Sequence, residues 1–330
     1  MFNKGKRNRL KNYAEALIFQ SAIWGSDMED RMEQPLVSVI MGVFNQWDEK
    51  ILRESVNSIL NQTYSKLEFI IWDDGSHPDA ARLVQKLTEL DPRIIVAGKE
   101  NNRGLAYSLN ECIRLARGKY IARMDADDIS KPLRIEKQIL FLETHPEYGW
   151  CGTGAELFDE EGTWGQRTMP EIPQKRDYLR YSPYIHPSVM FRAELFDENT
   201  GYLASEETLR CEDYEIFMNL AGHGQQGYNL QENLFYYRET RDSYKKRKVK
   251  FRLNEAKIRY RNYRKMGLLF PIGWIYVLRP IAACLIPAKV LELVKRYEGS
   301  RAKRIESTDC PTESSLKEMQ FQTVELMSAK

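Results

Sequence analysis

Apolar strand runs and amphipathic helix patterns alternate along residues 37–124. Continuous apolar segments, which are typical of buried strands, occur at residues 37–43, 67–72, 94–97 and 120–124. Between them, apolar residues spaced three and four apart predict helices with one buried face at residues 51–60, 78–90 and 105–116. This strand–helix repeat predicts an α/β fold with a mostly parallel central sheet and helices on both faces.

The rest of the chain carries a weaker pattern. Strands are predicted at residues 150–158, 188–191 and 234–238, and a helix at residues 214–220. We expect one domain over residues 35–245, an N-terminal extension at 1–34, basic and apolar helices at 246–298, and a disordered polar tail at 299–330. The extension fits either a short membrane-surface helix or an unstructured segment, and both readings stay open.

An apolar segment at residues 267–288 lies within the basic C-terminal region. One membrane crossing needs about 20 apolar residues, but three prolines interrupt this segment and Arg279 lies inside it. A charged residue near the centre of a bilayer is costly. We therefore expect broken helices that lie on an anionic membrane surface, with packing against the protein and spanning as the alternatives.

Composition narrows the function classes. Lysine and arginine number 49 against 47 aspartates and glutamates, so net charge gives no indication of nucleic-acid binding. The five cysteines are scattered without a C-x-x-C pair, which fits a reducing cytosol and argues against disulfides or zinc. The chain contains neither a G-x-x-x-x-G-K-[ST] phosphate loop nor a G-x-S-x-G elbow, and Gly152-Thr153-Gly154 lacks the third glycine of a dinucleotide site.

Polar clusters follow each of the first four predicted strands. They are Asn45, Asp73-Asp74-Gly75-Ser76, Asn101-Asn102-Arg103-Gly104, and Asp125-Ala126-Asp127-Asp128. In parallel α/β sheets, ligands bind at the carboxyl ends of the strands. The last cluster puts three carboxylates into four positions, and such a cluster suits a divalent cation shared with a diphosphate. A solvated acidic loop is the alternative when the cluster is taken alone.

These segments together resemble family 2 glycosyltransferases, which have the GT-A fold. The resemblance spans residues 35–245 and follows the family's order and spacing. It rests on Val37-Ser38-Val39-Ile40 with Asn45, Asp73-Asp74-Gly75-Ser76, Asn102-Arg103-Gly104, Ala122-Arg123-Met124-Asp125-Ala126-Asp127-Asp128 with Pro132 and Arg134, His186-Pro187-Ser188-Val189-Met190, and Glu212-Asp213-Tyr214.

The resemblance implies a role for each acidic segment. Asp125 and Asp127 would hold Mn²⁺ or Mg²⁺ on the diphosphate of a nucleotide-sugar, with Asp125 also near the ribose. Asp128 would add a contact behind the cation, or else would cap a helix before the Pro132 turn. Asp213 would be the catalytic base, with Glu212 as its rival and a helix N-cap as the structural alternative.

Other implied contacts involve the nucleotide and its phosphates. Asp74, and to a lesser degree Asp73, would hydrogen-bond the nucleobase, typically uracil, while Phe44 would stack on it unless it is a core residue. Asn45, Asn102 and Arg103 would also line the nucleotide site. His186 would approach the cation or diphosphate, or be satisfied within its own turn. Arg238 begins a segment, running to Ser243, that often contacts phosphate in the family but here lacks the usual histidine.

The implied activity is inverting transfer from a nucleotide-sugar, most simply a UDP-sugar. The implied acceptor is a glycan or lipid-linked oligosaccharide of a bacterial surface-polysaccharide pathway, reached from the cytoplasmic face of the cell membrane. Two rivals remain at this point. A sugar nucleotidyltransferase would carry a Gly-rich loop where Met41-Gly42-Val43-Phe44-Asn45 has one glycine, and a non-catalytic binding protein would not need Asp125, Asp127 and Asp213 intact.

Overall fold

The computed structural model describes residues 34–196, 201–239 and 249–282. The expectations for the N-terminal extension, the polar tail and Ser243 fall outside these residues.

Four parallel strands form one half of the sheet. In spatial order they are β3 (Ile94–Lys99), β2 (Leu67–Asp74), β1 (Val37–Val43) and β4 (Tyr120–Arg123). The register pairs Val43 with Asp73, and Asp73 with Gly98, so the strands end along one edge. The pattern of residues 37–124 predicted these four strands correctly, because strands buried on both faces are continuous apolar runs.

The other half of the sheet is mixed. It continues from β4 through β8 (Met190–Arg192), β6 (Trp150–Asp159), β9 (Gly227–Arg238) and β5 (Ile129–Ser130), with β7 (Gly162–Arg167) paired to β6. Strand β8 is antiparallel to both neighbours, whereas β6 and β9 are parallel. The acidic segment therefore connects β4, inside the sheet, to β5 at the end of the strand order.

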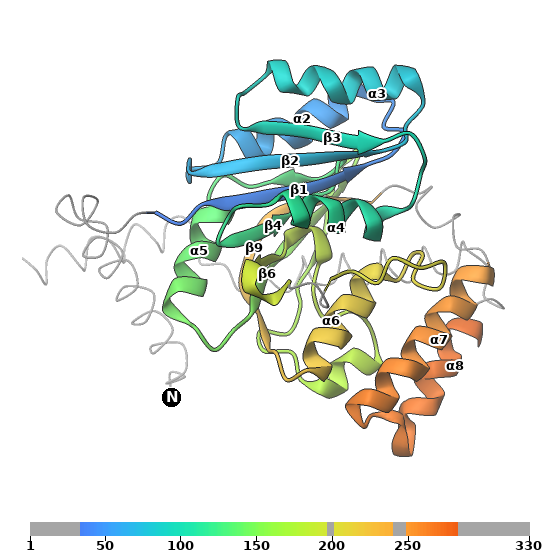
Figure 1. The fold of residues 1–330 in the computed structure, drawn as a ribbon. Coiled ribbons are helices and arrows are strands. Elements are labelled where there is room, and N and C mark those ends of the chain that lie inside the picture. The colour runs from blue at the N-terminus through green and yellow to red at the C-terminus, as the bar shows by residue number, and fades with distance from the viewer. Residues whose placement is uncertain (1–33, 197–200, 240–248, 283–330) are drawn as a thin grey trace, which may run out of the picture.

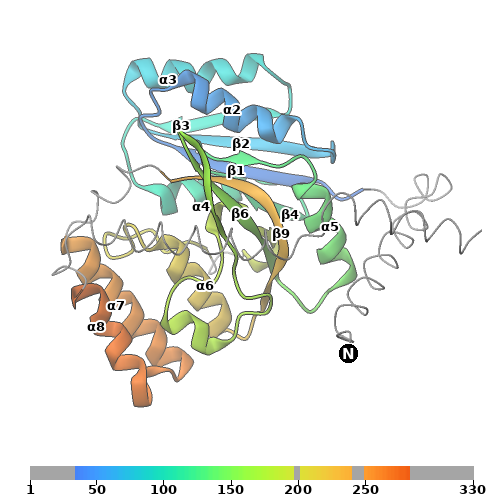
Figure 2. The same cartoon turned by 180° about the vertical axis from the view of Figure 1, so that it is seen from behind.

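Helices cover both faces of the sheet, as Figures 1 and 2 show. One face packs against α2 (Glu49–Leu60), α3 (Pro78–Gln85) and α5 (Arg134–Thr144), and the other packs against α4 (Leu105–Leu115) and α6 (Glu212–Gly222). Helix α7 (Val249–Met266) packs against α6. Alternate residues of β1 divide between the two cores. Val39 packs in the core that holds Leu52 and Ile135, and Ile40 in the core that holds Leu109 and Phe217.

The C-terminal helices are attached to this domain through buried groups. Ile258 and Tyr263 of α7 are fully buried, and the Tyr263 hydroxyl lies 2.8 Å from that of Tyr214 in α6. After α7 the chain breaks at residues 267–273 and returns as α8 (Trp274–Ala282), beside α7. The predicted break between helices is confirmed within the described residues, and their contact with a membrane surface stays a prediction. Among the described helices, none has the length and apolar character needed to cross a membrane.

Gly75 lets two strand-end loops approach closely. It follows β2 with φ of 74°, and a Cβ at this position would lie 2.7 Å from both Asn102 N and Glu100 O. Gly224 has a similar φ of 84°, but no atom lies within 4 Å of an added Cβ. The two glycines therefore share the backbone conformation and differ in the space around it.

We predict that Gly75→Ala lowers the free energy of unfolding more than Gly224→Ala does. The control variant carries only the cost of a left-handed L-residue, about 1–2 kcal/mol. Gly75→Ala adds a clash with backbone atoms that have no side-chain freedom to move away. Urea unfolding of both variants measures the difference, and equal losses would contradict the close approach.

Candidate active site

Asn45 ties the carboxyl end of β1 to the loop after β2. Its backbone N–H donates to Ser76 Oγ at 2.9 Å, and its Oδ1 accepts from the His77 N–H at 2.8 Å. Asn45 has φ of 50°, a left-handed conformation in which asparagine is enriched. The adjacent Phe44 ring is 51 % exposed, so it is not a core phenylalanine. The end of β1 thus presents an open aromatic face beside a fixed turn.

Asp73 and Asp74 hold the loops that frame this edge. Asp74 is 3 % exposed, and its two oxygens accept from the N–H groups of Arg103 and Gly104 at 3.0 and 2.7 Å. Burial raises the pKa of Asp74, while these backbone hydrogen bonds oppose the rise. Asp73 Oδ1 accepts from the Ser76 N–H at 3.1 Å. Both carboxylates therefore have structural partners, and their contact with a nucleobase stays a prediction.

The loop between β3 and α4 presents exposed polar and cationic groups. Asn102 and Arg103 are exposed, and the Arg103 guanidinium lies 4.0 Å from the centre of the Tyr107 ring. Such cation–π contacts orient a guanidinium without neutralising it. Arg103 is therefore presented at the strand-end edge with its charge available.

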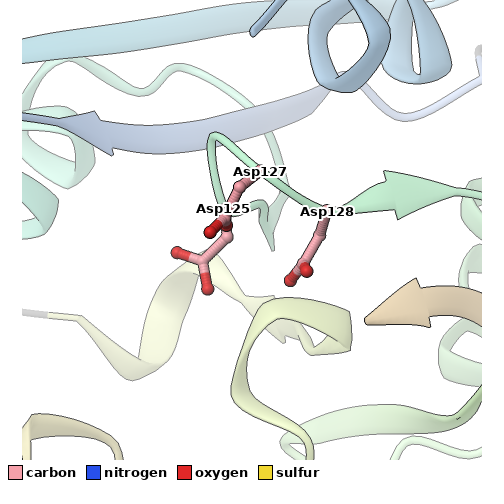
Figure 3. A group of neighbouring side chains, drawn as sticks. All are labelled: Asp125, Asp127 and Asp128. Atoms are coloured by element: carbon pink, nitrogen blue, oxygen red, sulfur yellow. The ribbon is translucent and has the colours of Figure 1, made fainter. Parts of the chain in front are cut away.

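Three carboxylates lie on the loop between β4 and β5, as Figure 3 shows. Oxygens of Asp125, Asp127 and Asp128 lie within 4.8 Å of one another. Desolvation, followed by the charge of Asp125, raises the pKa of Asp127 to about 6. Burial, followed by the charges of Asp127 and Asp125, raises the pKa of Asp128 well above its usual value. Crowded oxygen ligands of this kind fit a hard divalent cation.

A buried arginine lies against this cluster. Arg123 Nη1 is 2.5 Å from Asp125 Oδ2, and the Arg123 side chain is 2 % exposed. Burial lowers the pKa of Arg123, but the charge of Asp125 and its hydrogen bond raise it, and the pKa is raised overall. Arg123 was absent from the predicted site residues. The signal was present, because a charged residue inside a buried strand pattern needs a partner.

Asp128 and Arg238 are bound to each other, and their roles toward a cation and a phosphate stay predictions. Asp128 is buried, and its Oδ1 accepts from the Arg238 N–H at 2.7 Å. Helix α5 has Leu133 as its N-cap, so the capping role for Asp128 is wrong. Arg238 Nε donates to the Asp127 carbonyl at 2.8 Å, and its guanidinium lies over the Phe158 ring. Arg238 therefore supports the acidic loop from β9.

His186 is paired with a tyrosine. Its Nε2 lies 2.7 Å from the Tyr202 hydroxyl, and the imidazole is 6 % exposed. Burial, followed by the charge of Arg123, lowers the pKa of His186 well below its usual value, so the ring is neutral. Asn110 of α4 fixes Tyr202 by accepting from its N–H at 2.9 Å and donating to its carbonyl at 2.7 Å. Tyr202 is the second residue that the sequence analysis did not single out.

Glu212 and Asp213 form the first turn of α6. The N-cap is Cys211, so Asp213 is not a capping residue, although the amino end of a helix does favour its negative charge. Burial raises the pKa of both carboxylates. The Arg123 charge opposes this rise at Asp213. A carboxylate with a raised pKa suits proton abstraction near neutral pH.

The charges of both acidic positions act on Tyr202. Burial is the main cause of its raised pKa, and the charges of Asp213 and Asp125 both add to it. The loop after β4 and the first turn of α6 are therefore linked electrostatically through Tyr202, and also through Arg123, which pairs with Asp125 and whose charge acts on Asp213. The structure brings Asp125, Asp127 and Asp128 together and keeps Asp213 as a separate acidic position.

Known proteins that are similar in sequence to this chain are named as glycosyltransferases. EpsE of Bacillus subtilis, named as a glycosyltransferase, is 38 % identical over 81 % of this chain and 94 % of its own length. The O-antigen biosynthesis glycosyltransferase WbnJ of Escherichia coli is 31 % identical over 62 % of this chain and 79 % of its own.

Solved structures show the same fold at low identity. S. aureus TarS 1-349 in complex with UDP-GlcNAc has a TM-score of 0.56 at 17 % identity, and the match covers 73 % of this chain and 72 % of that 1-349 chain. The mannosyltransferase PcManGT from Pyrobaculum calidifontis, in complex with GDP-Man and Mn²⁺, has a TM-score of 0.53 at 18 % identity and covers 80 % of each chain. Residues 38–199 match the family described as Glycosyl transferase family 2, and the chain therefore belongs to this family of glycosyltransferases, with the GT-A fold.

Proposed function

We propose that this glycosyltransferase is an inverting, metal-dependent enzyme of hexosyltransferase type that uses a UDP-sugar. The observation that carries the proposal is the division of its acidic groups. Asp125 and Asp127 lie on the loop after β4, Asp213 lies on the first turn of α6, and the charges of Asp125 and Asp213 both act on Tyr202. An enzyme that holds a diphosphate and takes a proton from an acceptor needs two such separate positions.

The donor side is assigned to the ends of the four parallel strands. Asp125 and Asp127 would hold Mn²⁺ or Mg²⁺, and a bound cation offsets charge that develops on a departing nucleoside diphosphate. We expect the exposed Phe44 ring to stack on the base and Arg103 to meet a phosphate. Asn45, Asp74 and Asn102 would frame this side of the site. The related structures in complex with UDP-GlcNAc, and with GDP-Man and Mn²⁺, support a nucleotide-sugar donor.

The acceptor side is assigned to Asp213. In an inverting transfer one carboxylate removes the proton from the acceptor hydroxyl as that hydroxyl attacks the anomeric carbon. The burial that raises the pKa of Asp213 gives it the affinity for a proton that this step needs, and the Arg123 charge opposes that rise. Glu212 shares the turn and the raised pKa, so it is the competing assignment.

We predict that Asp213→Asn lowers the turnover number by about 10²–10⁴-fold, the range for loss of a general base. Binding of UDP with Mn²⁺, measured by calorimetry, should stay unchanged because the donor groups are intact. Glu212→Gln is the matched control and should retain most of the activity. Loss in Glu212→Gln with full turnover in Asp213→Asn would move the base by one residue, and unchanged turnover in both would contradict the acceptor-side assignment.

The acceptor is proposed to be a lipid-linked oligosaccharide at the inner face of the cell membrane. Relatives named for O-antigen biosynthesis and for amylovoran biosynthesis support a surface-polysaccharide pathway. The break before α8 and α8 itself expose large apolar side chains: Phe270 at 78 %, Ile275 at 68 % and Leu278 at 57 %. Arg264 and Lys265, at the end of α7, are exposed cations close to them in the chain. Apolar groups beside cations are typical of helices that lie on anionic lipid.

We predict that the double variant Ile275→Asp with Leu278→Asp binds vesicles containing phosphatidylglycerol at least tenfold more weakly. Inserting each apolar side chain is worth about 1.5–3 kcal/mol. The control is Ile172→Asp, at an exposed isoleucine of the segment after β7. Flotation of the full chain with vesicles measures both. Point changes are preferable to truncation at residue 262, which would remove the buried Tyr263. Equal flotation of the wild type, the double variant and the control would contradict membrane contact through α8.

A further inference from the structure

The acidic loop comprises residues 124–128, between β4 and β5. The last carbonyl of β4 and two alternate carbonyls of this loop are each held by a side chain from a different element. The Arg123 carbonyl accepts from Arg134 Nη2 of α5 at 2.7 Å. The Asp125 carbonyl accepts from Ser55 Oγ of α2 at 2.7 Å, and the Asp127 carbonyl accepts from Arg238 Nε of β9 at 2.8 Å. Every second carbonyl from Arg123 to Asp127 is thus held by a donor from a different element: α5, α2 and β9.

The donors are themselves held in place. Ser55 and Arg134 are fully buried. Arg134 Nε donates to Gln138 Oε1 at 3.1 Å, and Gln138 Nε2 donates to the carbonyls of Cys151 and Ser188, both at 2.8 Å. Within the described part of the chain, Arg134 forms no ion pair with a carboxylate. A buried charge is costly unless it is hydrogen-bonded, so this arginine is maintained against a substantial desolvation penalty.

Arg238 holds the loop at two points. Besides the Asp127 carbonyl, its backbone N–H binds Asp128 Oδ1 at 2.7 Å. Its guanidinium lies 4.4 Å from the centre of the Phe158 ring and 3.4 Å from Glu54 Oε2 of α2. Helix α2 therefore supports the acidic loop both directly, through Ser55, and indirectly, through Glu54.

We propose that Ser55, Arg134 and Arg238 are positioning residues that set the separation of the Asp125 and Asp127 carboxylates before a cation binds. Fixing the carbonyl of a residue fixes one of the two peptide planes that flank its Cα, and therefore restricts the directions in which its side chain can leave the backbone. A loop ordered in advance loses less conformational freedom on binding, and changes to the groups that orient metal ligands cost about 10–100-fold in affinity. The proposal rests on the metal-dependent function proposed above.

Ser55→Ala is the sharpest test, because it removes one hydroxyl from a helix interior where alanine is well accepted. We expect Mn²⁺ affinity to fall by about tenfold, measured with Mn²⁺ alone through the paramagnetic resonance signal of the free ion. Ser55→Thr, which keeps the hydroxyl, should recover most of it. The control is Ser38→Ala, which removes an equally buried hydroxyl, bonded to Glu68 and Gly118, at the amino end of β1.

Unchanged Mn²⁺ affinity in Ser55→Ala, or an equal loss in Ser38→Ala, would overturn the proposal. Amide hydrogen exchange of residues 124–128, measured without metal, separates this inference from the proposed function. Faster exchange in this segment of Ser55→Ala alone supports the positioning role, even if the wild-type protein binds no Mn²⁺ and the metal-dependent function falls. Unchanged exchange there would overturn the positioning role itself.

Discussion

Repulsion among three carboxylates is the constraint on which this site depends. Asp125, Asp127 and Asp128 lie within 4.8 Å of one another, in surroundings that raise the pKa of Asp127 and Asp128. The protein offsets part of this repulsion with Arg123, which is buried against Asp125, and with the Arg238 N–H, which binds Asp128. Part of the repulsion among the three carboxylates remains, and the proposed divalent cation would offset it.

The topology of the sheet makes this arrangement possible. Strand β4 lies between β1 and β8, and the loop that leaves it ends in β5, which pairs with β9. The acidic loop therefore touches elements from both halves of the sheet and is supported by α2, α5 and β9. On its other side, Arg123 and Tyr202 place it in electrostatic contact with Asp213 of α6. The proposed donor and acceptor roles thus belong to separate elements, the loop after β4 and α6, and the Arg123 guanidinium acts on both.

The first half of the fold was predictable from the sequence because its signals are local. Buried parallel strands are continuous apolar runs, and the helices between them each have one apolar face. The exception is the end of the helix predicted at residues 78–90: α3 ends at Gln85, a 3₁₀ turn follows at Lys86–Glu89, and Leu90 is exposed. Strand β9 begins at Gly227 rather than at Leu234. Its early part hides a polar residue, Asn229, whose amide donates to the carbonyls of Pro170 and Pro183.

The site was predictable in its acidic residues but not in their partners. The segments that carry Asp125, Asp127 and Asp213 stand out in sequence, and the structure places them at the strand-end edge and the first turn of α6. The bonds of Asp128 to Arg238 and of Ser55 to Asp125 join residues far apart in the chain, so no local pattern reveals them. The same holds for Tyr202, on which the charges of Asp125 and Asp213, from two different elements, both act.

The proposed function requires that Asp125 and Asp127 hold a cation together with a nucleoside diphosphate. Anomalous X-ray scattering at the manganese edge, from crystals grown with UDP and Mn²⁺, would locate this cation. We expect one strong peak in contact with the carboxylates of Asp125 and Asp127 and with the diphosphate oxygens. A peak at other residues, or bound UDP without a peak at this loop, would contradict it.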